Sequence, residues 1–166
     1  MSAAMRDGSA GAADVILRDG ATLRLRAPAA EDAGALTAFF GAMSERSLYL
    51  RFHGLQRIDE ALVEHFLEPD WENRGVLVGE LDGRIVSVGE YMRLRDESAV
   101  EAAFAVADEH QGRGIGTRLL EQLALRASEV GIERFVAEVM PENRAMLGVF
   151  EGTGLEVTRE LEGGEF

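Results

Sequence analysis

The sequence predicts one mixed domain of the α+β, three-layer α/β type. Its 166 residues are a usual size for a single domain, and no internal repeat is visible. Apolar residues recur at helical spacing early in the chain, alternate along strands in the middle, and return to helical spacing later. The composition, 46% hydrophobic and 28% charged, is typical of a globular chain, and no run approaches the ~18 apolar residues of a membrane span.

The first part of the chain predicts a leader, a hairpin and three helices. Residues 1–13 lack aromatic and β-branched residues and are expected to form a flexible leader, with one domain over residues 14–166. Asp19-Gly20 is a tight-turn signal between segments in which leucines alternate with arginines, which predicts a first strand or hairpin over residues 15–26. Apolar residues at helical spacing then predict helices over residues 28–40, 47–52 and 59–67.

The second part predicts a strand meander followed by alternating helices and strands. Strands are expected over residues 75–81, 84–93 and 99–106, the first two joined by a hairpin turn at Asp82-Gly83. A glycine-rich turn precedes an amphipathic helix that ends at Gly131. The remaining elements are a strand over 134–140, a helix over 142–151 and a strand over 155–161. The turn signal at 162–164 leads into a strand at Glu165-Phe166 that looks unfinished, which would suit a domain cut from a longer chain.

Composition also excludes several kinds of chemistry. The chain has no cysteine and no HExxH pair, so no metal is expected, and all 17 basic residues are arginine. A net charge of −13 argues against nucleic-acid binding and favours a cationic partner. No apolar signal-peptide core precedes the first strand, so a cytoplasmic protein without membrane contact is expected.

The segment with the strongest chemical signal lies between the strand ending at Val106 and the amphipathic helix. Gly112, Gly114 and Gly116 alternate there, and glycines at a helix start let backbone amides approach an anion. Arg113 and Arg118 are expected to reinforce this cradle. Taken alone, the same glycines fit a plain strand-to-helix turn equally well.

The string Gln111-x-x-Gly114-x-Gly116, after the strand Val100 to Val106, resembles the acetyl-CoA motif of the GCN5-related N-acetyltransferases. Element order is similar over residues 15–161, and residues 142–147 resemble the family's asparagine motif. Residues 47–52, 100–104 and 143–147 also resemble bacterial protein-lysine acetyltransferase domains, which are often fused to a further domain. The resemblance implies a mostly antiparallel mixed sheet with helices on both faces.

This resemblance also implies roles for residues near the cradle. Acetyl-CoA, or a CoA thioester of another short acyl group, would be the co-substrate, with pantetheine paired along the strand backbone and pyrophosphate on the turn amides. Asn143 would face the cofactor, or else bond the backbone at its own helix start. The residues implied to bind the cofactor are Phe104, Ala105, Val106, Gln111, Gly112, Arg113, Gly114, Gly116, Thr117 and Asn143.

A base is required because a free lysine amine has a pKa of about 10.4. Alternation places Glu101 on one strand face with Ala103 and Ala105, which leave room for substrate, and the lysine-acetyltransferase pattern carries its catalytic glutamate there. A solvated or paired strand glutamate is the alternative interpretation, with Glu90 and Glu138 as fallback bases.

One residue departs from the family pattern. Phe150 occupies the position where many members carry a tyrosine that protonates the leaving thiolate. Either the thiolate leaves without help, since a thiol pKa is about 8.5, or another group such as Tyr91 serves.

The acceptor site is expected near Tyr49, Arg51 and Phe52, although Tyr49 and Phe52 also fit a helix core. The acceptor implied is a lysine ε-amine of another protein, such as an acyl-CoA synthetase. The alternatives are a small-molecule amine, or a domain that senses acyl-CoA without catalysis.

Overall fold

The structure, a computed structural model, describes residues 12–52 and 58–136. Its described strands form one sheet in the order β1-β2-β3-β4-β5-β6, in which neighbouring strands are antiparallel except for the parallel pair β5 and β6. The strands are β1 (Ala13–Ile16), β2 (Thr22–Arg26), β3 (Arg74–Leu81), β4 (Arg84–Arg93), β5 (Ala99–Val106) and β6 (Arg134–Val136). The helices are η1 (Ala30–Asp32), α2 (Ala33–Gly41), α3 (Glu45–Phe52), α4 (Glu60–His65), η2 (Asp108–His110) and α5 (Ile115–Ser128).

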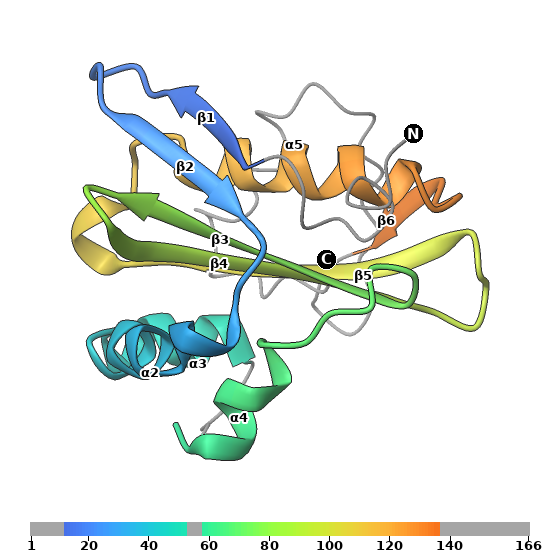
Figure 1. The fold of residues 1–166 in the computed structure, drawn as a ribbon, viewed down its shortest axis with the longest axis horizontal. Helices are drawn as coiled ribbons and strands as arrows, with labels where there is room; N and C mark the ends of the chain where they lie inside the picture. Colours follow the sequence, from blue (N-terminus) through green and yellow to red (C-terminus); the bar gives the residue numbers. More distant parts are fainter. Residues whose placement is uncertain (1–11, 53–57, 137–166) are drawn as a thin grey trace.

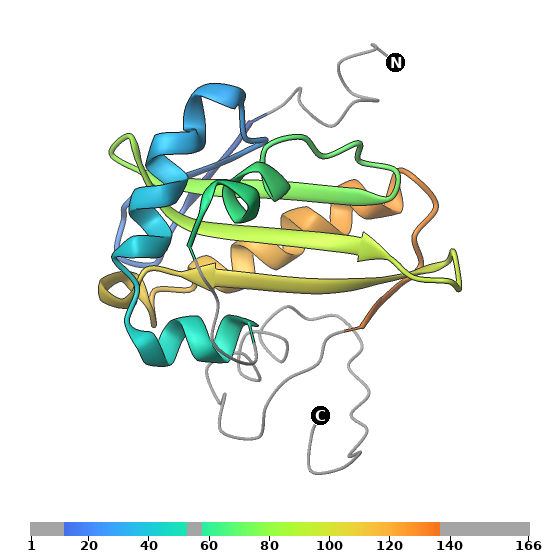
Figure 2. The same ribbon diagram turned by 90° about the horizontal axis from the view of Figure 1, so that it is seen from below.

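Helices cover both faces of this sheet. The long helix α5 lies on one face, and α2, α3 and α4 lie on the other (Figures 1 and 2). The predicted mixed, mostly antiparallel architecture is therefore confirmed. It also gives the sheet two chemically separate faces, which decides below which side chains can meet.

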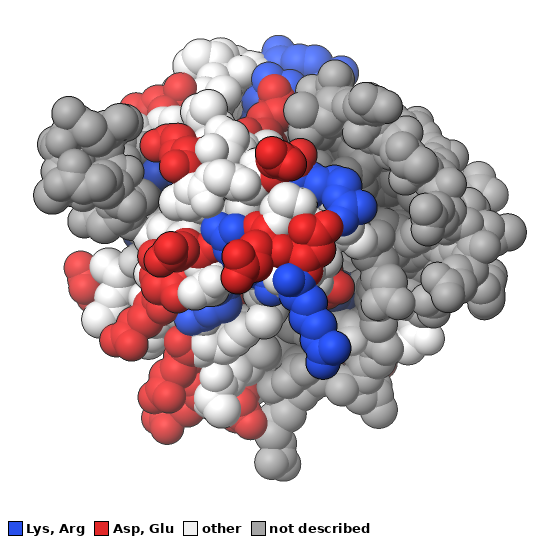
Figure 3. Space-filling model, turned by 90° about the vertical axis from the view of Figure 1, so that its right-hand side faces the viewer, with Lys and Arg blue, Asp and Glu red and all other residues white. Residues whose placement is uncertain are grey.

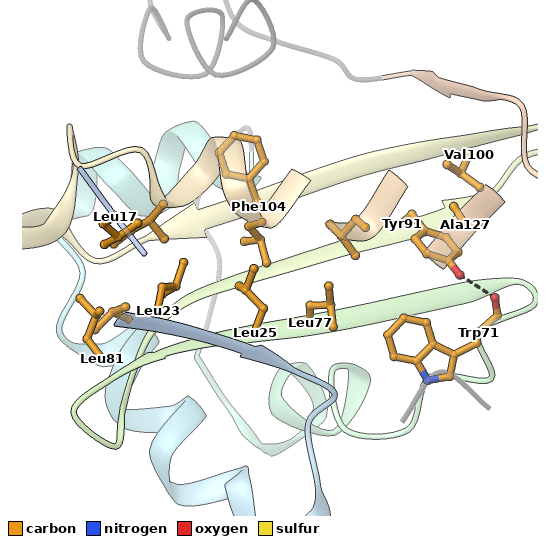
Figure 4. Close-up of a cluster of buried hydrophobic side chains, with 14 of the residues drawn as sticks. Leu17, Leu23, Leu25, Trp71, Leu77, Leu81, Tyr91, Val100, Phe104 and Ala127 are labelled. Carbon is orange, nitrogen blue, oxygen red and sulfur yellow. Dashed lines mark hydrogen bonds between the residues drawn. The ribbon is translucent and has the colours of Figure 1, made fainter. Parts of the chain in front are cut away.

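Each face has its own apolar core. Leu119 and Leu123 of α5 are fully buried in a cluster between this helix and the sheet that includes Leu77 and Phe104 (Figure 4). On the other face, Phe40 of α2 packs 5.3 Å, centroid to centroid, from Phe66. Burial of a large apolar side chain contributes about 1.5–3 kcal/mol, so these two clusters hold the helical layers on the sheet.

The predicted turns and most predicted elements are confirmed. Gly20 and Gly83 have φ values of 91° and 77°, the left-handed conformation that tight hairpin turns require. The helix predicted from Pro28 instead starts with the 3₁₀ turn η1, and α4 is shorter than predicted because the chain already turns at Phe66. The predictions for residues 1–11, most of the strand 134–140, the helix 142–151 and the strand 155–161 lie outside the described residues.

Within the part of the chain that the structure describes, no helix is both long and apolar enough to cross a membrane.

Candidate active site

The glycine turn leaves open space beside its backbone. Gly112 and Gly114 have φ values of 82° and 84°, and a Cβ on either would meet no atom within 4 Å. Gly114 is the N-cap of α5, no described side chain caps this helix start, and its first turn contains no acidic residue. Backbone amides at such a helix end attract anions, so the turn fits a phosphate-bearing ligand.

The two arginines of this segment are already paired. Arg113 donates to Asp19 in the β1–β2 turn at 2.7 Å, and Arg118 pairs with Glu121 at 2.7 Å. The hydrogen bond from Arg113 lowers the pKa of Asp19. Each of the two arginines that are predicted to reinforce the cradle is thus paired with a carboxylate, and their contribution to anion binding stays a prediction.

The segment that leads into the glycine turn also holds the start of α3. The Asp108 carboxylate accepts from Ser44 N at 3.2 Å, from Ser44 Oγ at 2.8 Å and from Ser47 Oγ at 3.0 Å. Burial alone would raise the pKa of Asp108, but these hydrogen bonds outweigh it and lower that pKa. Gln111 donates to Val106 O at 3.1 Å and to Ser47 Oγ at 3.4 Å. Together these hydrogen bonds connect the start of α3 to the segment between β5 and α5.

The backbone of β5 presents alternate peptide groups to opposite sides. Ala107 N donates to Val86 O, and Leu94 N donates to Ala99 O. The N–H and C=O groups of the odd-numbered residues of β5 therefore face β4. Those of Phe104 and Val106 consequently point to the other edge, the side on which β6 pairs with Ala99–Glu101.

Glu101 lies on the sheet face covered by α2, α3 and α4. The register places Met92 of β4 opposite it on one side and Val136 of β6 opposite it on the other. The prediction that Ala103 and Ala105 share its face is confirmed, since Ala105 packs in the core cluster under α2. The Glu101 side chain is exposed. It is therefore a carboxylate open to an incoming amine.

Glu90, the fallback base, has a different environment on the same face. It lies opposite Ala103, diagonally across from Glu101, and is only 7% exposed. Its carboxylate is 3.2 Å from His65 Nε2 and 3.7 Å from an Arg51 guanidinium nitrogen. Burial lowers the pKa of Arg51, although the nearby carboxylates of Glu90 and Glu101 oppose this shift. Arg51 thus lies close to both glutamates.

The predicted acceptor residues separate into two kinds. Tyr49 is 43% exposed, so its interpretation as core is wrong. Phe52 packs against Phe40 with ring centroids 5.9 Å apart, so its interpretation as core is confirmed.

Tyr91 is on the wrong face to act as an acid beside Glu101. Its ring is completely buried under α5, and its hydroxyl donates to Trp71 O at 2.6 Å (Figure 4). Desolvation is the main cause that raises its pKa. The suggestion that Tyr91 protonates the thiolate is therefore wrong. Asn143, Glu138 and Phe150 lie outside the described residues.

Two features of the site were not anticipated from the sequence. His65 pairs with Glu90, and Asp108 joins α3 to the glycine turn. Both contacts link residues from separate segments, and neither residue belongs to a local motif. Among the described ranges, no group of three or more His, Cys, Asp or Glu side chains is placed to hold a metal ion.

The fold and this site define the class of protein: a mixed-sheet domain with an anion cradle at the start of its long helix and an exposed carboxylate on the strand before it. The acetyltransferase (GNAT) family model matches residues 44–155, and the chain belongs to this family. It is a GNAT acetyltransferase domain.

Several known proteins are similar. "Acetyltransferase Pat" of Mycolicibacterium smegmatis is 35% identical over 121 residues, which are 70% of this chain and 36% of that protein. "Acetyltransferase PA5475" of Pseudomonas aeruginosa is 27% identical over 78% of this chain and 73% of its own length. The crystal structure of the GNAT domain of S. lividans PAT superposes with a TM-score of 0.87 at 35% identity, covering 99% of this chain and 96% of that one. The chain thus spans about a third of the Mycolicibacterium relative.

Proposed function

We propose that this chain transfers an acetyl group from acetyl-CoA to the ε-amine of a lysine in another protein, with Glu101 as the general base. The observation that carries the proposal is the exposed Glu101 carboxylate on the strand that leads into the open glycine turn. The resemblance to bacterial protein-lysine acetyltransferase domains implies the protein acceptor, and the similarity to acetyltransferase Pat and to the GNAT domain of S. lividans PAT is consistent with it.

The chain's own residues supply binding and orientation. Acetyl-CoA would supply the activated acetyl group, and the open glycine turn at the uncapped start of α5 suits its pyrophosphate. The outward peptide groups of β5 suit an extended pantetheine arm. The residues proposed to hold the co-substrate are Phe104, Ala105, Val106, Gln111, Gly112, Arg113, Gly114, Gly116, Thr117 and Asn143.

Glu101 performs the proton step of the transfer. A lysine ammonium binds beside its carboxylate and gives up a proton to it, directly or through water. The neutral nitrogen then forms a bond to the acetyl carbonyl carbon, the carbon–sulfur bond breaks, and the nitrogen loses its second proton to solvent as the amide forms. The thiolate leaves with the electron pair of that bond and takes a proton from solvent, which a thiol pKa of about 8.5 makes feasible without a tyrosine.

Arg51 and Tyr49 belong to the acceptor side of this site. Arg51 pairs with Glu90, and its charge also interacts with Glu101, while Tyr49 presents an exposed ring on the same helix. An acyl-CoA synthetase in the cytoplasm is the kind of acceptor we propose. A fused domain in the whole protein is also part of the proposal. It is supported by the structures of a cAMP-binding acyltransferase from Mycobacterium smegmatis, in which the match to this chain covers 43–45% of the longer chain.

A small amine is the second candidate acceptor. "L-amino acid N-acyltransferase MnaT" of Escherichia coli is 30% identical over 90 residues, 52% of this chain. An acyl-CoA sensor without turnover is the remaining alternative.

The test compares Glu101→Gln with Glu133→Gln, a second exposed glutamate, located in the turn before β6. Acetyl-CoA binding is measured by calorimetry, and acetyl transfer to lysine-bearing proteins and to free amino acids by mass spectrometry. We expect Glu101→Gln to bind acetyl-CoA normally but to lose about 10²–10⁴-fold in turnover, and Glu133→Gln to match the wild type.

Because the chain contains no lysine, every ε-acetyl-lysine detected belongs to the acceptor. Full turnover in Glu101→Gln would refute its role as base. Transfer to amino acids alone would favour the small-amine candidate, and acetyl-CoA binding without any transfer would favour the sensor.

A further inference from the structure

We infer that Met92 and Val136 form an apolar strip on either side of Glu101 that selects lysines flanked by apolar residues in the acceptor protein. This inference rests on the proposed function and names the acceptor's local chemistry.

The strip follows from the register of three adjacent strands. Met92 of β4 lies opposite Glu101 of β5, and Val136 of β6 lies opposite it on the other side. Paired residues of neighbouring strands point to the same face, so the order across the sheet is apolar, acidic, apolar. Strands are about 4.8 Å apart, so the two apolar residues are separated by roughly 10 Å with the carboxylate between them.

Both apolar side chains are unusually open to solvent. Met92 is 44% exposed and Val136 is 39% exposed. They are two of only five large hydrophobic residues exposed in the described part of the chain, the others being Ile16, Tyr49 and Leu125. A pair of exposed apolar side chains on both sides of one exposed carboxylate is a surface suited to a partner.

The surroundings of the strip are polar. Arg74 of β3 is the next residue across the sheet after Met92 and donates to Glu68 O at 3.0 Å, so a charged residue ends the strip on that side. Figure 3 shows acidic and arginine side chains mixed over the end of the molecule where β4 turns into β5. Exposed apolar residues inside a polar rim are typical of a protein interface, and here the two apolar residues also enclose one carboxylate.

Charge and shape together identify the occupant. A lysine side chain has an apolar stem of methylenes and a cationic end, so its stem can lie on the strip while its nitrogen reaches Glu101. The net charge of −13 also favours a cationic segment. About 10 Å of strip exceeds the width of one lysine stem, so residues next to the lysine also contact it. If the residues that flank the lysine are apolar, they bury apolar surface against Met92 and Val136. Polar flanking residues do not gain this burial.

The test uses two synthetic lysine peptides of equal charge. One carries leucine and valine at the two positions on each side of the lysine, and the other carries serine and threonine there. Free lysine serves as a small acceptor. The variants are Met92→Ser and Val136→Ser, and the matched control is Leu125→Ser, whose apolar side chain is 57% exposed on α5, across the sheet.

We expect the wild type to prefer the apolar-flanked peptide about tenfold in kcat/KM, since burying some 50 Å² of apolar surface has about that effect. Met92→Ser and Val136→Ser should each remove most of this preference and leave acetyl-CoA affinity unchanged, while transfer to free lysine, whose stem alone contacts the strip, should fall by a smaller factor. Leu125→Ser should keep the preference.

Equal loss with every acceptor, or an unchanged preference in both variants, would overturn the strip while leaving protein-lysine acetylation in place. A wild type that acetylates neither peptide nor any protein lysine would overturn the proposed function and the strip together.

Discussion

Arg26 joins three segments of the fold and offers a sharp test of its electrostatics. Its guanidinium donates to Asp32 of η1 at 2.8 and 2.9 Å and to Glu80 of β3 at 2.9 and 3.3 Å. Arg26→Met keeps most of the side-chain volume but leaves both carboxylates without their cation. Their side chains are only 10% and 18% exposed, so the remaining charges stay largely desolvated.

The magnitude follows from this burial. Breaking a fully buried ion pair by removing one partner costs about 3–5 kcal/mol. Because the Arg26 side chain is 23% exposed, solvent screens part of the interaction, and we expect Arg26→Met to lose about 2–4 kcal/mol of unfolding free energy. The loss is a substantial share of the about 5–15 kcal/mol that stabilises a typical domain.

The loss should also depend on pH. The hydrogen bond from Arg26 is the main cause that lowers the pKa of Asp32, aided by a bond from Ala29 N and opposed by burial. A carboxyl whose pKa is lower in the folded state stabilises the fold above its unfolded pKa of about 3.9 and loses this contribution as pH falls through the folded value. The difference between wild type and variant should be full near neutral pH and shrink below about pH 4.

Urea unfolding at pH 7 and pH 3.5 measures both effects. Arg24→Met is the matched control, because Arg24 lies on the same strand but pairs with Asp14 at 3.9 Å with both side chains more than half exposed. It should cost at most about 1 kcal/mol. The reasoning is refuted if Arg26→Met costs no more than the control, or if its cost is the same at both pH values.

Two further predictions concern the site. Asp108→Ala removes the carboxylate that holds Ser44 and Ser47, so the KM of a lysine acceptor should rise about tenfold while acetyl-CoA affinity changes less than twofold. Asp108→Asn should restore the KM. Loss of thermal stability with an unchanged KM would show that the contact is merely structural. Gly114→Ala should weaken acetyl-CoA binding about tenfold by calorimetry, because the φ of Gly114 is 84° and the added Cβ enters the open space of the cradle. Gly131→Ala is the control: the φ of Gly131 is 83°, so this variant should lose a similar ~1 kcal/mol of stability but leave binding intact. Equal binding in both variants would argue against the cradle.

Local signals in the sequence were sufficient for most of the described fold. Asp82-Gly83 and the alternation on both sides of it predict the β3–β4 hairpin, because turn chemistry and period two act over a few residues. The same alternation places Tyr91 and Glu90 on opposite faces, but only the β4–β5 register shows that Glu90 and not Tyr91 shares a face with Glu101.

Contacts between distant segments could not be predicted in this way. Glu90 meets Arg51 from α3 and His65 from α4 only because two helices pack on the same sheet face. No spacing in the sequence records how helices are placed over a sheet, and any of the 30 acidic residues was a formal partner for these two side chains. The pairing of Arg113 with Asp19 was hidden for the same reason.

The different environments of the two glutamates are the physical basis for their proposed roles. Glu90 is buried and lies against Arg51 and His65, so its oxygens already have cationic or hydrogen-bonding neighbours. These two neighbours and the burial leave the Glu90 carboxylate less open to an incoming amine than that of Glu101. Glu101 has water access and two small alanines beside it on its strand, which leave room for an amine. Glu90 therefore suits the task of fixing Arg51, and Glu101 is the carboxylate that we propose as the base.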